Sequence, residues 1–315
     1  MTRFLGREHE LKELMQLLHK TSASLVVFRG RRRIGKSRLA EEFAKQFSKY
    51  YIFSGLPPSK HPTADTQRAE FRRQMGVLGI ASYDANDWAN LFLLVAKTCE
   101  QSPSLVVLDE ITWMGSKDPD FLGKLKIAWD LHFKMNPKLI LILSGSNSAW
   151  IEENILSSTG FVGRISYQLL LGELPLQVCN QFWGEKRFNI SAYEKFKILG
   201  VVGGIPRYLE EILPNQTAEE NIERLCFTRT GVLFSEFDNI FADLFGTRFQ
   251  GYRSIVKCLV NGPRSLDEIA HELGRVRGGD LTVSLEELEE SGFLTRDFVW
   301  HLKNGQISKL SRFRL

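Results

Sequence analysis

One segment, Gly30-Arg31-Arg32-Arg33-Ile34-Gly35-Lys36-Ser37, restricts the possible folds of this chain more than any other feature. It matches the pattern G-x-x-x-x-G-K-[ST], follows an apolar run at 24–29 and opens a helical pattern at 37–47. In that context the glycines let the backbone curl so that its N–H groups face an anion, and the helix start adds partial positive charge. The segment therefore predicts a phosphate-binding loop between a buried strand and a helix.

The side chains of this loop predict a nucleotide and a metal ion as ligands. Lys36 can reach the β- and γ-phosphates of ATP, and the Ser37 hydroxyl can ligate Mg²⁺. The three consecutive arginines can bind a polyanion, but more simply they shape the mouth of the site or pair with acidic residues. We expect the remaining nucleotide contacts of the loop from Gly30, Arg33, Ile34, Gly35 and Arg38.

A second apolar run, 105–108, ends in the carboxylates Asp109 and Glu110. At the carboxyl edge of a parallel sheet such residues lie beside the phosphate loop. We expect Asp109 to hold Mg²⁺, directly or through water, and Glu110 to polarise the attacking water. This adjacent pair favours ATP hydrolysis over nucleotide storage. The alternative is a capping box at the start of the next helix.

Two further segments each have a functional and a structural interpretation of equal weight. The run 139–143 leads into the polar residues 144–147, where Ser144 is a candidate contact to the γ-phosphate or its attacking water. The alternative is an N-cap for the helix that starts near Ala149. Arg164 precedes the run 165–171 and is a candidate γ-phosphate contact, in its own chain or from a neighbouring subunit. Its alternative is a surface ion pair.

The alternation of strand and helix patterns predicts the fold class. It implies right-handed β-α-β units and a parallel sheet. We predict an α/β P-loop NTPase domain of the ASCE type at 1–172, with strand order 5-1-4-3-2. Helical signals interrupted by Gly203-Gly204-Ile205-Pro206 predict a lid domain at 173–246. The five predicted strands are 24–29, 50–53, 104–108, 139–143 and 165–171.

The last segment, 247–315, has the pattern of a winged helix-turn-helix: three helical patterns, then two strand patterns joined around Asn304-Gly305. Such modules often bind DNA through the third helix. Here that helix, 280–290, carries four glutamates, and residues 250–315 hold 10 Lys or Arg against 9 Asp or Glu. A protein contact or a role as a cover for the ATPase domain is therefore the alternative to DNA binding.

The chain resembles the archaeal-type P-loop ATPases of the STAND/AAA-like group, which also occur in bacteria. The loop at 30–37 is the most specific part of this resemblance. The other segments that carry it, which together span nearly the whole chain, are 4–8 with Glu10-Leu11, 108–110, 143–146, Gly163-Arg164 and 203–209.

The resemblance implies further nucleotide contacts. It places Leu5, Gly6 and Arg7 at the border of the adenine, where the alternative is a helix start with Gly6 as a turn residue. It brings Pro206 toward the nucleotide, where the alternative is a helix end followed by a proline-started helix. Members of the group usually continue into a domain that resembles restriction endonucleases. The sequence ends at Leu315 without that domain, so we expect a truncated form, and a nuclease role has no support.

Together these features predict an ATP-hydrolysing enzyme that acts as a nucleotide-dependent switch and turns over slowly without a partner. The alternative is a DNA-binding regulator for which ATP is only a ligand, and a nucleotide kinase is a weaker third option. We expect ATP or ADP, Mg²⁺, and a protein client or a second copy of the chain as partners. The apolar runs are far shorter than the ~20 residues of a membrane helix. The four separated cysteines indicate reduced thiols in the cytoplasm.

Overall fold

The computed structural model describes residues 4–57, 63–82, 86–100, 102–115, 117–245, 248–301 and 306–315, without the side chains of 242–244, 299–301 and 306–310. The chain divides into two compact units, Met1–Phe234 and Ser235–Leu315. The three-domain division stays a prediction, because its second boundary, 246/247, lies outside the described residues. Within the described ranges, no helix is both long and apolar enough to cross a membrane.

Unit 1 is built on a five-stranded parallel sheet with the order β2-β3-β4-β1-β5, which confirms the predicted order. β3 and β4 are buried along their whole length, which explains why their sequences are continuous apolar runs rather than alternating ones. β1 pairs with β4 on one side and with β5 on the other, so its carboxyl end lies near the centre of one sheet edge. The strands are β1 (Ser24–Arg29), β2 (Lys49–Ser54), β3 (Ser104–Asp109), β4 (Leu139–Gly145) and β5 (Ile165–Leu170).

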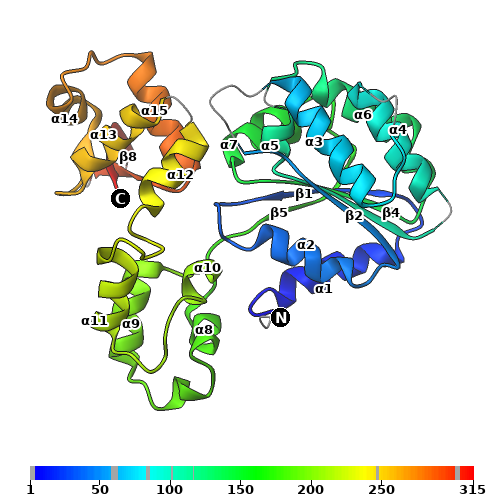
Figure 1. The fold of residues 1–315 in the computed structure, drawn as a ribbon. Helices are drawn as coiled ribbons and strands as arrows, with labels where there is room; N and C mark the ends of the chain where they lie inside the picture. Colours follow the sequence, from blue (N-terminus) through cyan, green and yellow to red (C-terminus); the bar gives the residue numbers. More distant parts are fainter. Residues whose placement is uncertain are drawn as a thin grey trace. The chain divides into compact units, whose positions relative to one another are not determined.

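Helices cover both faces of this sheet (Figure 1). Alternate residues of β1 belong to two different cores, with Leu25 and Val27 in one and Val26 and Phe28 in the other, as the two-residue period of a strand requires. One face carries α1 (Glu8–Gln16) and α2 (Lys36–Ala44); the other carries α3 (Ala64–Val77), α4 (Trp88–Cys99), α5 (Ile111–Met114), α6 (Phe121–Leu131) and α7 (Ser148–Ile151).

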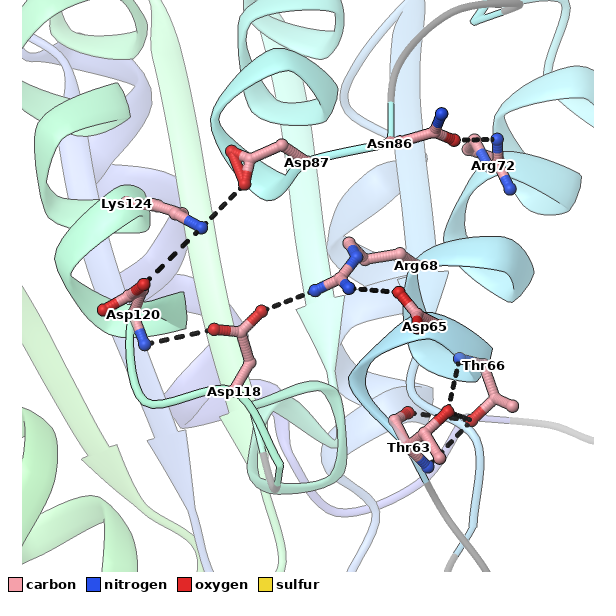
Figure 2. Close-up of polar contacts among 10 residues, drawn as sticks. All are labelled: Thr63, Asp65, Thr66, Arg68, Arg72, Asn86, Asp87, Asp118, Asp120 and Lys124. Carbon is pink, nitrogen blue, oxygen red and sulfur yellow. Dashed lines mark hydrogen bonds and ion pairs between the residues drawn. The ribbon is translucent and has the colours of Figure 1, made fainter.

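The sequence patterns do not predict α3. Along this helix Gln67, Phe71 and Met75 are the buried residues, so its apolar stripe is too narrow to stand out. Polar contacts hold its first turn in place (Figure 2): Arg68 pairs with Asp65 in the same helix and with Asp118 at 2.6 Å. In the same cluster Lys124 of α6 binds Asp87, the N-cap of α4, at 2.7 Å. Ion pairs thus connect the N-terminal ends of α3, α4 and α6.

The remainder of unit 1 is helical, as the sequence predicts. Its core is continuous with that of the α1–α2 face, because Ile198, Val202 and Tyr208 cluster with Leu39 and Phe43 of α2. Its elements are α8 (Leu176–Cys179), a 3-10 segment at Asn180–Phe188, α9 (Ala192–Val202), α10 (Pro206–Leu209) and α11 (Ala218–Ile222).

In the residues that the structure describes, unit 2 combines four helices with a small antiparallel sheet of order β6-β8-β7. Ser265 and Glu268 form the predicted capping box at the start of α14. The strands β7 and β8 pair as predicted, and the predicted turn at Asn304-Gly305 lies outside the described residues. The winged-helix interpretation stays a prediction. The elements are α12 (Glu236–Phe245), α13 (Phe249–Leu259), β6 (Arg264–Ser265), α14 (Leu266–Glu272), α15 (Gly279–Glu290), β7 (Thr295–His301) and β8 (Gln306–Arg314).

Candidate functional site

The loop between β1 and α2, the P-loop, has the curled backbone that phosphate binding requires. Gly30 and Gly35 have φ angles of 145° and 99°, and Arg33 is left-handed at 67°. A side chain at Gly30 would place its Cβ 2.5 Å from the carbonyl oxygen of Leu171, so this position admits glycine alone. The backbone conformation of the loop therefore explains why glycine occupies positions 30 and 35.

Lys36 folds back over this loop. Its Nζ donates hydrogen bonds to the carbonyl oxygens of Gly30 at 2.8 Å and Arg31 at 3.1 Å, and the residue is 5% exposed. Burial lowers the pKa of the Lys36 ammonium, while the nearby carboxylates of Glu110 and Asp109 oppose that shift. A buried cation of this kind is stabilised by an anion that enters the loop.

Ser37 and Asp109 bring the two sequence motifs into contact. The Ser37 hydroxyl donates to the Asp109 carboxylate at 2.6 Å, and Asp109 is 8% exposed. No group of three His, Cys, Asp or Glu residues gathers in the part of the chain that the structure describes. One carboxylate beside one hydroxyl fits Mg²⁺, which is usually bound through one or two protein oxygens together with phosphates and water.

Glu110 lies next to this pair in a left-handed conformation, at φ 50°. Its carboxylate accepts hydrogen bonds from the Ser146 hydroxyl at 2.9 Å and from the Ser146 backbone N–H at 3.3 Å. Burial raises the pKa of Glu110 above its usual value, and the Lys36 ammonium partly offsets this. Glu110 precedes α5 without capping it through its side chain, so the capping-box alternative finds no support.

The structure separates the two serines at the end of β4. Ser144 is buried, and its hydroxyl has no hydrogen-bond partner among the described residues. Ser146 contacts Glu110 instead, and Asn147 caps α7 through the Trp150 N–H at 3.0 Å. The N-cap alternative therefore holds for Asn147, while the role of Ser144 stays a prediction. Strand alternation cannot choose between Ser144 and Ser146, because residues two apart share a face.

A cavity of about 450 Å³ opens above the P-loop. Sequence reasoning missed four of the residues that line it. Phe4 lies inside a motif already identified and Arg207 directly follows Pro206, whereas Phe182 and Glu210 had no sequence signal. Arg32 lines it too, as one of the three arginines expected at the mouth of the site. Nine predicted residues line it as well: Leu5, Arg7, Arg33, Gly35, Lys36, Ser37, Arg38, Glu110 and Pro206.

The N-terminal residues of this wall are held from both sides. Arg7 is 5% exposed and donates to the carbonyl oxygens of Ile34 at 3.1 Å and Gly172 at 2.5 Å. Gly6 has a φ of 84°, and a Cβ there would lie 2.3 Å from Cγ1 of Val178. Gly6 is therefore a turn residue at a close approach of α8, and Arg7 joins the P-loop to the chain that follows β5.

Pro206 fits both of its interpretations. It occupies the first turn of α10, as the proline-started-helix alternative requires. Its Cγ would also lie 3.8 Å from a Cβ built on Gly35, which places it against the P-loop.

Arg164 lies at the opposite edge of the sheet. It directly precedes β5, whose first residue pairs with Leu25, whereas the P-loop follows Arg29. At about 3.3 Å per residue this separates Arg164 from the P-loop by roughly 20 Å along the strands. The guanidinium instead binds the Asp130 carboxylate through two hydrogen bonds of 2.9 Å. This geometry does not support a γ-phosphate contact within one chain, and a contact from a neighbouring subunit stays a prediction.

Comparison with known proteins gives a consistent result. Residues 4–212 match the model of a family described as an ATPase domain predominantly from Archaea. An uncharacterised protein of Methanocaldococcus jannaschii is 28% identical over 302 residues, which are 93% of this chain and 62% of that protein. This chain thus spans less than two thirds of that relative's length.

Two solved structures share the fold. The Walker-type ATPase of Pyrococcus abyssi aligns with a TM-score of 0.66 at 18% identity, over 97% of this chain and 93% of that one. The ORC2 protein of Aeropyrum pernix, solved in complexes with ADPNP and ADP, aligns with a TM-score of 0.61 at 16% identity, over 100% of this chain and 92% of that one.

Proposed function

Since this chain belongs to the family of ATPase domains found predominantly in Archaea, we propose that it hydrolyses Mg²⁺-ATP and acts as a nucleotide-dependent switch. The observation that carries the proposal is the convergence of Ser37, Asp109 and Glu110 at the edge of the sheet where the P-loop opens. Two separate sequence motifs meet there through a 2.6 Å hydrogen bond. That arrangement serves phosphoryl transfer, which depends on positioning and charge stabilisation.

Each of these residues has a defined task in the proposed reaction. The N–H groups of the P-loop and the Lys36 ammonium bind the β- and γ-phosphates. Ser37 and Asp109 would hold Mg²⁺, which neutralises phosphate charge when bound. Glu110 takes a proton from the attacking water, and a raised pKa makes its carboxylate a stronger base. Ser146 fixes the direction of that carboxylate through its N–H and its hydroxyl.

Other cations of the cavity wall supply further charge. Arg32 and Arg33 line the cavity and are placed to offset the negative charge of a triphosphate. Arg207 lines it as well and pairs with Glu211 at 2.8 Å. Phe4 and Phe182 offer aromatic surface for a nucleotide base. We propose that Arg164 contacts the γ-phosphate bound by a second copy of the chain, because its own P-loop lies at the other edge of the sheet. If so, the isolated chain hydrolyses ATP slowly, and self-association increases the rate.

DNA binding by unit 2, the alternative from the sequence, has less support. Seven arginines in its described part already lie 2.7–3.3 Å from carboxylates: Arg248, Arg253, Arg264, Arg277, Arg296, Arg312 and Arg314. A duplex would have to replace these partners with phosphates, and the charge of the segment 250–315 is close to balanced.

Phosphate release from Mg²⁺-ATP, measured with and without duplex DNA, tests the proposal. We expect basal release without DNA and little change when DNA is added. Binding of ATP without phosphate release under either condition would favour the regulator that uses ATP as a ligand only. Absence of ATP binding in calorimetry would remove both functions.

A further inference from the structure

The arginine triplet of the P-loop has contacts that phosphate binding does not explain. Arg31 Nη1 lies 3.8 Å from Glu173 Oε1, just beyond β5. The Arg33 guanidinium lies 6.0 Å above the ring centre of Tyr208 in α10. Two of the three arginines therefore contact the helical region that follows the sheet, here called the lid (173–234).

The chain that enters the lid, residues 171–174, is joined to the end of β1 directly and to the P-loop through Arg7. The Leu171 N–H donates to the Arg29 carbonyl at 2.9 Å, and Arg7 holds the carbonyls of both Ile34 and Gly172. One buried guanidinium thus bridges the middle of the P-loop and the second residue of this connection. If phosphate binding moves the Ile34 carbonyl, Arg7 would transmit that movement to the Gly172 carbonyl, because it donates to both.

The other side of the same connection is fastened to the lid. Glu173 Oε2 accepts a hydrogen bond from the Gly204 N–H at 2.9 Å, and the Leu174 N–H donates to the Gly204 carbonyl at 2.8 Å. Both positions favour glycine, because a Cβ on Gly204 would lie 2.3 Å from the Leu174 carbonyl oxygen and Gly203 has a φ of 58°. The two glycines allow this close approach, and Pro206 follows them against Gly35.

We propose that Arg31, Arg33 and Glu173 form a latch that couples the P-loop to α10, so that the occupied or empty state of the P-loop sets the position of the lid. The proposal rests on the proposed function, in that ATP is the ligand of the loop. Glu173 is the central positioning residue, because its carboxylate contacts Arg31 with one oxygen and Gly204 with the other. The latch assigns Arg31 and Arg33 to communication between the P-loop and the lid and does not require a polyanion partner.

Hydrogen exchange of the full chain, read by mass spectrometry in the peptides 30–38 and 203–212, tests the latch. Glu173→Ala removes both contacts of the carboxylate. Glu173→Gln keeps an acceptor for Gly204 and loses the charge that faces Arg31, and Arg31→Ala removes the partner. Glu219→Gln is the matched control, because Glu219 is an exposed lid carboxylate that pairs with Lys197 away from the cavity.

Without nucleotide, we expect exchange in 203–212 to rise about tenfold in Glu173→Ala, as for loss of a hydrogen bond to a charged group. In Arg31→Ala and Glu173→Gln we expect about a twofold rise, since Arg31 and Glu173 are partly exposed. No change should appear in Glu219→Gln. Exchange in 203–212 that stays at the wild-type rate in Glu173→Ala would overturn the latch, whether or not the protein binds nucleotide.

With Mg²⁺-ADPNP, the wild type should exchange more slowly in both peptides. In Glu173→Ala and Arg31→Ala the slowing of 30–38 should persist while the slowing of 203–212 falls at least about threefold. Full slowing of 203–212 in both variants would overturn the coupling. If ADPNP slows neither peptide in the wild type, the proposed function fails instead, and the measurements without nucleotide still decide whether Glu173 holds the lid.

Discussion

The two edges of the sheet differ in how far their charged side chains are buried and paired. At the carboxyl edge Lys36 and Glu110 are largely buried, and burial moves the pKa of each toward the value that favours its neutral form. At the amino edge Asp130 is partly exposed and meets Arg164 and Lys126, each at 2.9 Å. Hydrogen bonds from these two cations hold the pKa of Asp130 far below its usual range.

This difference separates a binding site from a structural network. Exposed side chains of opposite charge that pair with one another add little to the free energy of folding and need no ligand to balance their charge. Buried ions with shifted pKa values are costly to keep, and such groups concentrate where a ligand completes their environment. The comparison therefore identifies the carboxyl edge as the site of chemistry and assigns Arg164, within one chain, to the surface network.

Removal of the Lys36 ammonium should have the largest effect. Lys36→Ala should weaken ATP binding by roughly 100-fold, because the β- and γ-phosphates lose a buried cationic partner. Isothermal calorimetry measures this, with Lys126→Ala at the amino edge as the control. Unchanged ATP affinity in Lys36→Ala would refute the P-loop assignment.

Neutralising the proposed base should affect turnover and spare binding. Glu110→Gln should bind Mg²⁺-ATP about as well as the wild type and hydrolyse it at least ~100-fold more slowly, since general base catalysis contributes about that much. Steady-state phosphate release together with calorimetry checks both halves. Turnover near the wild-type rate would mean that another group activates the water.

The hydrogen bonds to Glu110 should have a smaller effect with a distinct pH signature. Ser146→Ala should lower the maximal rate by roughly tenfold with little change in KM. The Ser146 hydroxyl lowers the Glu110 pKa, so its loss should move the acidic limb of the rate profile to higher pH. Ser144→Ala provides the comparison. A larger loss of maximal rate in Ser144→Ala than in Ser146→Ala would indicate that Ser144, and not Ser146, supports the catalytic group.

Arg164 should have the smallest effect in dilute protein. Arg164→Ala should change ATP binding by no more than about twofold, because an exposed ion pair contributes little. If a second copy uses this arginine, hydrolysis by concentrated protein should fall more than ADP binding does. Turnover at two protein concentrations measures this, with Lys134→Ala as the control from the same network. Equal losses for ATP and ADP would favour the surface ion pair.

The parts of the site that depend on local chain geometry could be predicted from the sequence. The P-loop and the Asp109-Glu110 pair each combine a strand signal with a fixed chemistry. The β-α-β pattern predicts the parallel sheet, and the assignment to the ASCE type of P-loop NTPase predicts the strand order. The sequence also held the information that places Arg164 correctly. A residue that precedes a parallel strand lies at the amino edge, away from a loop that follows another strand.

What depends on packing between distant segments could not be predicted. Phe182 and Glu210 reach the cavity because the lid folds back over the P-loop, and neither lies in a recognisable motif. The helix α3 is held by Gln67, whose amide binds both the N–H and the carbonyl of Leu56, and by Arg68, rather than by a broad apolar face. The contact from Ser146 to Glu110 depends on where β4 ends, which strand alternation leaves open.

The central claim is that the half-buried carboxylate of Glu110 is the base for ATP hydrolysis. Single-turnover hydrolysis of Mg²⁺-ATP as a function of pH, measured for the wild type beside Glu110→Gln, tests it most directly. A raised pKa keeps Glu110 protonated to higher pH, so the wild-type rate should fall as the pH drops through a midpoint above the usual glutamate value of 4.5. Glu110→Gln should be slow and should lack that limb. An acidic limb with the same midpoint in both proteins would contradict the claim.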